Sequence, residues 1–207
     1  KKSASLVVIT GRRRIGKSRL IEEFANQNPQ HDFLRFSGLT PTKEITAQDQ
    51  REEFARNLNK QLKLPRLKAD DWGDLLDTLA EQCKNKKTII LLDEISWMGS
   101  KDKTFLAKLK NAWDLYFSKN TNLVLVLCGS VSSWIEKNII SGTGFLGRFE
   151  AQIKLEELSI SECNEYFRQV GFQVSDYEKL TYLALTGGVP WYLELLNPKY
   201  SSLENIN

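Results

Sequence analysis

The sequence predicts an α/β fold in which helices flank a parallel β-sheet and a smaller helical segment follows. Three near-continuous apolar runs, at residues 5–10, 88–92 and 123–128, are typical of strands that are buried on both faces. Amphipathic stretches separate these runs, as expected for βαβ units whose crossovers are helices. No strand pattern follows residue 155 or so. We therefore expect a core over residues 1–155 and a helical lid over residues 156–207.

The elements follow from the spacing of apolar residues in chain order. Apolar or β-branched runs predict the strands, and apolar residues at i, i+3 and i+4 predict the helices. The expected strands are 5–10, 32–38, 87–94, 122–130 and an edge strand within 149–158. The expected helices are 18–27, 44–62, 71–83, 104–117, 131–138, one that opens at Ser159, and 176–186. Pro65 ends the second helix, and Ser159 with Glu162 forms a capping box.

Several side chains are expected on the buried faces of these helices. In the first helix they are Leu20, Ile21 and Phe24. In the later helices they are Phe54, Ala55, Leu58, Leu62, Leu75, Leu76, Leu79, Ala80, Cys83, Phe105, Leu109, Ala112, Trp113, Tyr116, Cys163, Tyr166, Phe167 and Val170.

Composition excludes several classes of protein. The net charge of +3 over 207 residues is too small to demand a nucleic-acid partner, and no run of eighteen apolar residues suggests a membrane span. Cys83, Cys128 and Cys163 are far apart and form no Cys-x-x-Cys pair, and His31 is the only histidine. We therefore expect reduced, buried cysteines, no zinc site and a cytoplasmic location.

Residues 11–18 match the pattern G-x-x-x-x-G-K-[ST] between an apolar strand and an amphipathic helix. In this pattern Gly11 and Gly16 let backbone N–H groups approach phosphate oxygens, and the following helix adds its positive N-terminal end. Lys17 would reach the β- and γ-phosphates, and the hydroxyl of Ser18 would bind Mg²⁺. The remaining residues counted with this nucleotide site are Arg12, Arg13, Arg14, Ile15 and Arg19.

The three arginines of the loop have two interpretations. They are either solvated charges that raise the local positive potential, or direct contacts to phosphate or to a partner. A nucleic acid that binds Lys1, Lys2 and these arginines is a further alternative, although no aromatic residue in that stretch offers a base-stacking platform.

Two acids end the apolar strand "TIILLDE". Ligands bind at the carboxyl edge of parallel sheets, so Asp93 is expected to serve the magnesium ion. Glu94 is expected to polarise the attacking water as a general base. The alternative is that both acids merely end a strand at the surface.

Two further residues are candidates for catalysis. Ser130 follows the next apolar strand, where its hydroxyl can sense phosphate, orient water or cap a helix. Arg148 follows a glycine-rich stretch, where it can stabilise the charge that develops in phosphoryl transfer or form a surface ion pair.

The motifs "VVITGRRRIGKSRLIEEF", "TIILLDEISWM", "LVLCGSVSSW", "GFLGRF" and "LTGGVPWYLE" stand in an order that resembles the archaeal-type ATPases. These are P-loop NTPases of the STAND class, related to AAA+ proteins. The resemblance implies ATP and Mg²⁺ as cofactors and supports the roles given to the loop, the two acids, Ser130 and Arg148. It also implies that Gly188 and Pro190, in the lid, lie near the nucleotide base.

The resemblance further implies that such proteins carry a Phe-x-Gly-Arg segment before the first strand and a winged-helix or other domain after the lid. Neither pattern occurs in this sequence, so we expect a fragment with an incomplete lid.

Two functions fit these observations. The first is a slow, Mg²⁺-dependent ATP hydrolase that acts as a nucleotide-controlled molecular switch. The second is a nucleotide-gated binding module or adaptor with negligible hydrolysis. The expected ligands are ATP and ADP. A protein partner or self-association fits either function, and DNA would require a domain that this sequence does not contain.

Overall fold

The structure is a computed structural model, and it describes residues 3–206. The chain divides into two compact units. The first unit consists of residues 3–10 and Lys17–Lys154, and the second consists of Gly11–Gly16 and residues 155–206. The sequence predicted a boundary near residue 155, but it did not predict that the loop Gly11–Gly16 belongs to the second unit. The assignment of these units as functional domains stays a prediction.

A five-stranded sheet with the order β2-β3-β4-β1-β5 organises the first unit. The strands are β1 (Ser5–Gly11), β2 (Asp32–Ser37), β3 (Thr88–Asp93), β4 (Leu123–Gly129) and β5 (Ala151–Leu155). The pairs β2–β3, β3–β4 and β1–β4 are parallel, in registers that include Ser37 opposite Asp93 and Thr10 opposite Gly129. The predicted parallel α/β fold is confirmed.

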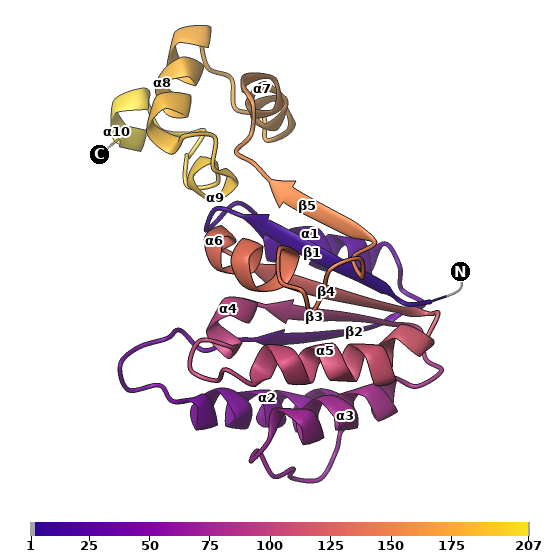
Figure 1. The fold of residues 1–207 in the computed structure, drawn as a ribbon. Coiled ribbons are helices and arrows are strands. Elements are labelled where there is room, and N and C mark those ends of the chain that lie inside the picture. The colour runs from indigo at the N-terminus through magenta and orange to yellow at the C-terminus, as the bar shows by residue number, and fades with distance from the viewer. Residues whose placement is uncertain (1–2, 207) are drawn as a thin grey trace. The chain divides into compact units, whose positions relative to one another are not determined.

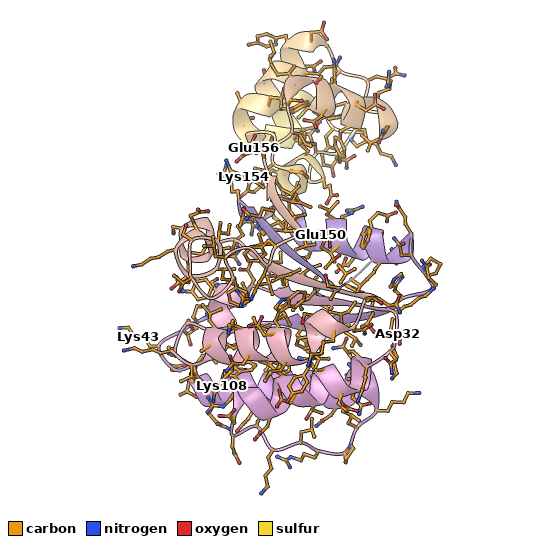
Figure 2. The ribbon with its side chains drawn as sticks, turned by 45° about the vertical axis from the view of Figure 1, so that its right-hand side comes forward. Asp32, Lys43, Lys108, Glu150, Lys154 and Glu156 are labelled. Atoms are coloured by element: carbon orange, nitrogen blue, oxygen red, sulfur yellow. The ribbon has the colours of Figure 1, made fainter. Side chains whose placement is uncertain are left out.

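Helices cover both faces of this sheet (Figure 1). The helices of the first unit are α1 (Lys17–Asn26), α2 (Ala47–Leu62), α3 (Trp72–Cys83), α4 (Ile95–Met98), α5 (Phe105–Leu115) and α6 (Ser132–Ile135). A 3₁₀ turn at Phe117–Lys119 follows α5, and a π-helical turn at Glu136–Ile140 follows α6. In Figure 2, Asp32 at the start of β2 and Lys43 in the loop after β2 lie at opposite ends of the sheet.

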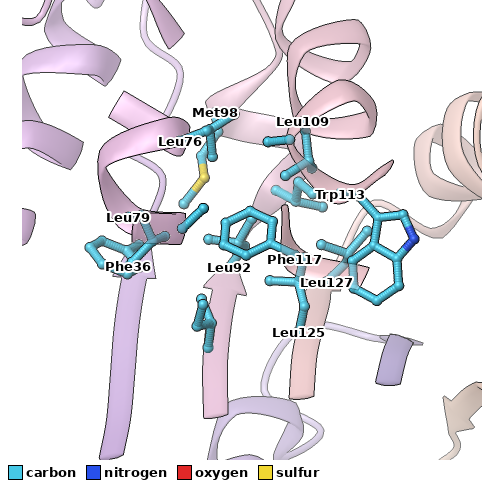
Figure 3. Packing of buried hydrophobic residues seen from close by; sticks show 14 of the residues in the cluster. Phe36, Leu76, Leu79, Leu92, Met98, Leu109, Trp113, Phe117, Leu125 and Leu127 are labelled. Atoms are coloured by element: carbon cyan, nitrogen blue, oxygen red, sulfur yellow. The ribbon is translucent and has the colours of Figure 1, made fainter. Parts of the chain in front are cut away.

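The main core lies between the sheet and α2, α3 and α5. Alternate residues of β3, Ile90 and Leu92, belong to this cluster, while the intervening Ile89 and Leu91 are buried outside it. This alternation shows that β3 is buried on both faces, as its unbroken apolar run predicted. Figure 3 shows Trp113 of α5 packed beside Leu127 of β4.

Three helices differ from the predicted burial. In α1 the buried stripe is Lys17, Ile21 and Ala25, while Leu20 and Phe24 are 39% and 43% exposed. The sheet contacts only this narrow i, i+4, i+8 stripe, so the two large flanking residues stay near solvent.

Helix α5 ends at Leu115, and Tyr116 is exposed because the chain turns there into the 3₁₀ segment that buries Phe117 instead. In the second unit, Val170 is likewise exposed, because it follows the end of its helix as the C-cap residue.

The second unit contains the helices α7 (Ile160–Gln169), α8 (Asp176–Thr186), α9 (Pro190–Leu193) and α10 (Ser202–Ile206). The predicted capping box of Ser159 and Glu162 is present at the start of α7. A small aromatic core of Phe167, Phe172 and Tyr182 joins α7 to α8.

Two further expectations concern cysteines and membrane spans. Cys83, Cys128 and Cys163 are buried and free of disulfides, as predicted. Within residues 3–206, no helix combines the length and the apolar character that crossing a bilayer requires.

Candidate functional site

Two sequence-predicted acids follow one another at the carboxyl end of β3, and they have different environments. Asp93 is the last residue of the strand and is 4% exposed. Its Oδ2 accepts a hydrogen bond from the hydroxyl of Ser18 at 2.8 Å, and its Oδ1 accepts one from the backbone N–H of Glu94 at 3.1 Å. The first unit therefore brings together, at the start of α1 and the end of β3, the two residues that were each expected to bind Mg²⁺.

Glu94 has a left-handed backbone conformation, with φ 50° and ψ 49°. A non-glycine residue pays about 1–2 kcal/mol for this conformation, and strain of this kind is frequent at active sites. The Oγ of Ser130 lies 3.0 Å from each carboxylate oxygen of Glu94, and the Ser130 N–H donates to Oε2 at 3.2 Å. Ser130 therefore contacts the predicted general base directly.

Arg35 also reaches Asp93, and the sequence analysis missed it. Its Nη2 donates to Asp93 Oδ2 at 2.7 Å, while Nη1 bonds the carboxylate of Glu22 on α1. The available signal was a lone arginine inside the apolar strand "DFLRFS", two residues before the strand ends. An exposed position on an edge strand explains such an arginine equally well, so the pattern alone could not identify this contact.

Lys17 and Arg19 occupy the first turn of α1 but differ in burial. Lys17 is 6% exposed, whereas Arg19 is exposed. Nearby, burial raises the pKa of the Cys128 thiol, the charge of Asp93 raises it further, and Lys17 opposes this shift. Cys128 therefore stays protonated at neutral pH.

Arg148 lies in a bidentate ion pair. Its Nε and Nη2 donate to the carboxylate of Asp114, on α5, at 2.8 and 3.0 Å. Hydrogen bonds from Arg148 and, to a smaller extent, the ion pair with Lys110 lower the pKa of Asp114 from 3.8 to about 2. The structure thus shows the ion pair that the sequence left open as the alternative, and a role of Arg148 at phosphate stays a prediction.

The glycines of the loop, within the second unit, adopt conformations that favour glycine. Gly11 has φ +148° and Gly16 has φ +94°. A Cβ on Gly11 would lie 2.5 Å from the carbonyl oxygen of Leu155, so a larger residue cannot be placed there without a shift of the backbone. The buried Ile15 closes the loop through a weak hydrogen bond from its N–H to the Arg12 carbonyl at 3.4 Å.

Two lid residues taken from the family resemblance also lie in the second unit. Gly188 has φ +69°, and its carbonyl accepts a hydrogen bond from the N–H of Leu158 at 2.9 Å. A Cβ on Gly188 would lie 2.4 Å from the carbonyl oxygen of Leu158. Pro190 opens α9 at its first turn, a position that suits proline because no N–H donor is needed there.

The loop arginines make different contacts in the second unit. The guanidinium of Arg14 lies 3.9 Å from the centre of the Trp191 ring and donates a hydrogen bond to the Tyr192 hydroxyl at 3.2 Å. Arg12 pairs with Glu157 at 3.4 Å, and Arg13 is exposed. Sequence reasoning also missed the two aromatic partners.

These contacts bear on the nucleic-acid alternative. Arg12 and Arg14 already engage side chains of the second unit, while Lys1 and Lys2 lie outside the described residues. That alternative therefore gains no support from the structure.

The donor set around Asp93 fits Mg²⁺. The Ser18 hydroxyl and the buried Asp93 carboxylate supply hard oxygen ligands 2.8 Å apart. Among residues 3–206, no cluster of three or more His, Cys, Asp or Glu side chains could hold a metal ion. A site with one carboxylate is typical of Mg²⁺ that is held partly by substrate phosphates.

A family model described as an AAA domain matches residues 1–135, which include the loop, Asp93, Glu94 and Ser130. The chain belongs to the AAA domain family. It is an AAA-type ATPase domain, and the predicted resemblance to archaeal AAA+-like ATPases is confirmed.

Three solved structures share the fold of this AAA domain. A Walker-type ATPase of Pyrococcus abyssi is 21% identical with a TM-score of 0.63, covering 98% of this chain and 63% of that one. The ORC2 protein of Aeropyrum pernix is 15% identical with a TM-score of 0.62, covering 93% of this chain and 55% of that one. A STAND protein of Pyrococcus horikoshii is 19% identical with a TM-score of 0.55, covering 95% and 28%.

A curated relative comes from Methanocaldococcus jannaschii, where the matching protein is uncharacterised. It is 25% identical over 189 residues. The match covers 91% of this chain and 38% of the relative, so the chain spans well under half of that protein.

Proposed function

We propose that this AAA domain binds ATP with Mg²⁺, hydrolyses it slowly and acts as a nucleotide-controlled molecular switch. One observation carries the proposal. Two acid–hydroxyl pairs, Asp93 with Ser18 and Glu94 with Ser130, lie at the carboxyl end of β3, and Ser18 completes a G-x-x-x-x-G-K-S loop.

Different residues of the chain would have separate roles in phosphoryl transfer. The N–H groups of the loop Gly11–Gly16 and the ammonium of Lys17 would bind the phosphates and orient them for in-line attack. Ser18 and Asp93 would hold Mg²⁺, which when bound neutralises the charge that develops on the phosphate oxygens. Glu94 would accept a proton from the attacking water.

Ser130 would set the position of that base. Its hydroxyl and N–H fix the Glu94 carboxylate, so the base would not have to be ordered when ATP binds. Arg148 would stabilise charge at the γ-phosphate only after it leaves Asp114, which is consistent with slow turnover. The expectation that Gly188 and Pro190 lie near the base of the nucleotide rests on the family resemblance alone.

The same contacts favour a second function, a nucleotide-gated adaptor with negligible hydrolysis. Both oxygens of Glu94 lie within hydrogen-bond distance of Ser130, and hydrogen bonds donated to a carboxylate make it a weaker base, which favours negligible hydrolysis. Under this alternative ATP or ADP would control a protein partner, or DNA through a further domain. Solved structures with this fold include ORC2 of Aeropyrum pernix with ADPNP and ADP, and ORC1 of the same organism with DNA.

Calorimetric titration with ATP and ADP in the presence of Mg²⁺, together with phosphate release from the same samples, tests the proposal. We expect binding by the parent, loss of binding in Lys17→Ala and loss of phosphate release in Glu94→Gln. The exposed Glu81→Gln, on α3, is the matched control and should release phosphate at the parental rate. Thermal unfolding of each variant checks that it is folded.

The outcomes separate the two functions. Binding with release that depends on Glu94 supports the switch, and binding without release supports the adaptor. Absence of nucleotide binding by the folded parent would contradict both.

A further inference from the structure

Arg35 is a cation that already occupies the carboxylate expected to serve the metal. Its Nη2 lies 2.7 Å from Asp93 Oδ2, the same oxygen that accepts the hydroxyl hydrogen of Ser18. The Asp93 side chain is 6% exposed and the Arg35 side chain is 41% exposed. The pair therefore joins a buried anion to a cation that can reach solvent.

The backbone of Arg35 is held in place independently of this ion pair. Because β2 is an edge strand, the peptide groups of Arg35 lack a neighbouring strand on one side. Gln61 of α2 supplies the missing partner: its Oε1 accepts from the Arg35 N–H at 3.0 Å, and its Nε2 donates to the Arg35 carbonyl at 2.8 Å. The position of the residue is thus fixed while its long side chain can change partners.

A second acid gives the guanidinium an alternative partner. Glu22, on α1, bonds the other terminal nitrogen of Arg35, and its side chain is as exposed as that of Arg35. When Arg35 leaves Asp93, it can therefore stay paired with Glu22 at the surface. A buried carboxylate without a counter-charge is costly, so Asp93 requires either Arg35 or another cation.

We propose that Arg35 is a positioning residue that neutralises Asp93 in the metal-free protein and withdraws to Glu22 when Mg²⁺ and nucleotide bind. The proposal rests on the proposed nucleotide site. Because two cations compete for one carboxylate oxygen, Arg35 weakens the effect of Mg²⁺ on nucleotide affinity. An ion pair that stayed in place when Mg²⁺ binds would not lead to this result.

The quantity to measure is the ratio of the nucleotide dissociation constant in EDTA to that in saturating Mg²⁺, with a fluorescent ATP analogue as the probe. In Arg35→Gln no cation has to leave Asp93, so we expect this ratio to rise roughly five- to tenfold, within the usual range of coupling between sites. In Glu22→Gln the guanidinium has only Asp93 as a partner, so the ratio should fall.

Three variants distinguish competition from a general effect of charge. Glu23→Gln removes the same charge one residue along α1, at a side chain that bonds Gln27 instead, and should leave the ratio within about twofold of the parent. Glu22→Gln added to Arg35→Gln should have no further effect. Arg35→Lys keeps the charge and should stay near the parent.

The outcomes decide the proposal even if Arg35→Gln does not fold, because Glu22→Gln changes an exposed residue. The proposal is supported if the ratio rises in Arg35→Gln, falls in Glu22→Gln and is unchanged in Glu23→Gln. A fall of the ratio in Glu22→Gln alone also supports it. An unchanged ratio in Glu22→Gln, or equal shifts in Glu22→Gln and Glu23→Gln, overturns it while the nucleotide site stands. Absence of nucleotide binding by the parent overturns the proposed function and this inference together.

Discussion

Replacing Asp114 with asparagine should destabilise the first unit by an amount that depends on pH. The carboxylate accepts two hydrogen bonds from Arg148 and pairs with Lys110, and these contacts, the largest of them from Arg148, hold its pKa at about 2 instead of 3.8. A difference of this size corresponds to about 2.4 kcal/mol at neutral pH. Both side chains are about 30% exposed, so screening by solvent reduces the expected loss to about 1–2 kcal/mol.

The sign of the pH dependence follows from the lowered pKa. The charged form of Asp114 stabilises the folded state, so its contribution is complete above pH 4 or so and disappears as the pH falls to about 2. Urea unfolding between pH 7 and pH 3 measures this effect. Asp114→Asn should lie 1–2 kcal/mol below the parent at pH 7, and about half of that difference should remain at pH 3.

The exposed Asp70→Asn provides a control for the loss of one negative charge in the same unit. It should change the unfolding free energy by less than about 0.5 kcal/mol. If Asp114→Asn and Asp70→Asn have equal stability at pH 7, or if the loss in Asp114→Asn does not shrink as the pH falls, the reasoning about the ion pair is refuted. Arg148 would then be available for a role at phosphate without a cost in stability.

Two further substitutions test the packing of each unit by urea unfolding. Gly188→Ala should cost more than about 2 kcal/mol of unfolding free energy, because its Cβ would meet the Leu158 carbonyl at 2.4 Å. Gly171 has a similar positive φ but open space around it, so Gly171→Ala should cost only about 1 kcal/mol. Equal losses in the two variants would contradict the steric argument. Trp72→Ala should cost about 3–5 kcal/mol, because the ring is fully buried against Phe105. Trp72→Phe should cost less than about 1.5 kcal/mol, because it also removes an indole N–H that has no partner among residues 3–206. If Trp72→Phe lost as much unfolding free energy as Trp72→Ala, this N–H would have to be hydrogen-bonded.

Much of the fold could be predicted from the sequence because burial on both faces leaves an unbroken apolar run. The runs ending at Asp93 and Gly129 gave strands whose bounds agree with the structure to within a residue or two. Helix faces were less certain. Leu20 and Phe24 follow helical spacing as well as Ile21 does, and only the width of the contact with the sheet decides which of them is buried.

Side-chain partners were harder to predict than the motifs that contain them. The loop and the acid pair are local patterns, so Ser18, Asp93 and Glu94 could be named from spacing. Arg35 and Asp93 are in contact although they lie 58 positions apart in the sequence. The spacing of apolar residues predicts helices and strands, but it does not predict a side-chain pair of this kind. The stacking of Arg14 on Trp191 is similarly remote in sequence.

The path of the chain between the two units limits what can be learned from shortened proteins. The backbone passes from one unit to the other after residue 10, after residue 16 and after residue 154. Ending the protein near residue 155 would keep the sheet, yet it would remove Trp191 and Tyr192, which contact the guanidinium of Arg14. Nucleotide affinities measured on such a truncation would describe a phosphate loop in which Arg12 has lost Glu157 and Arg14 has lost these two partners.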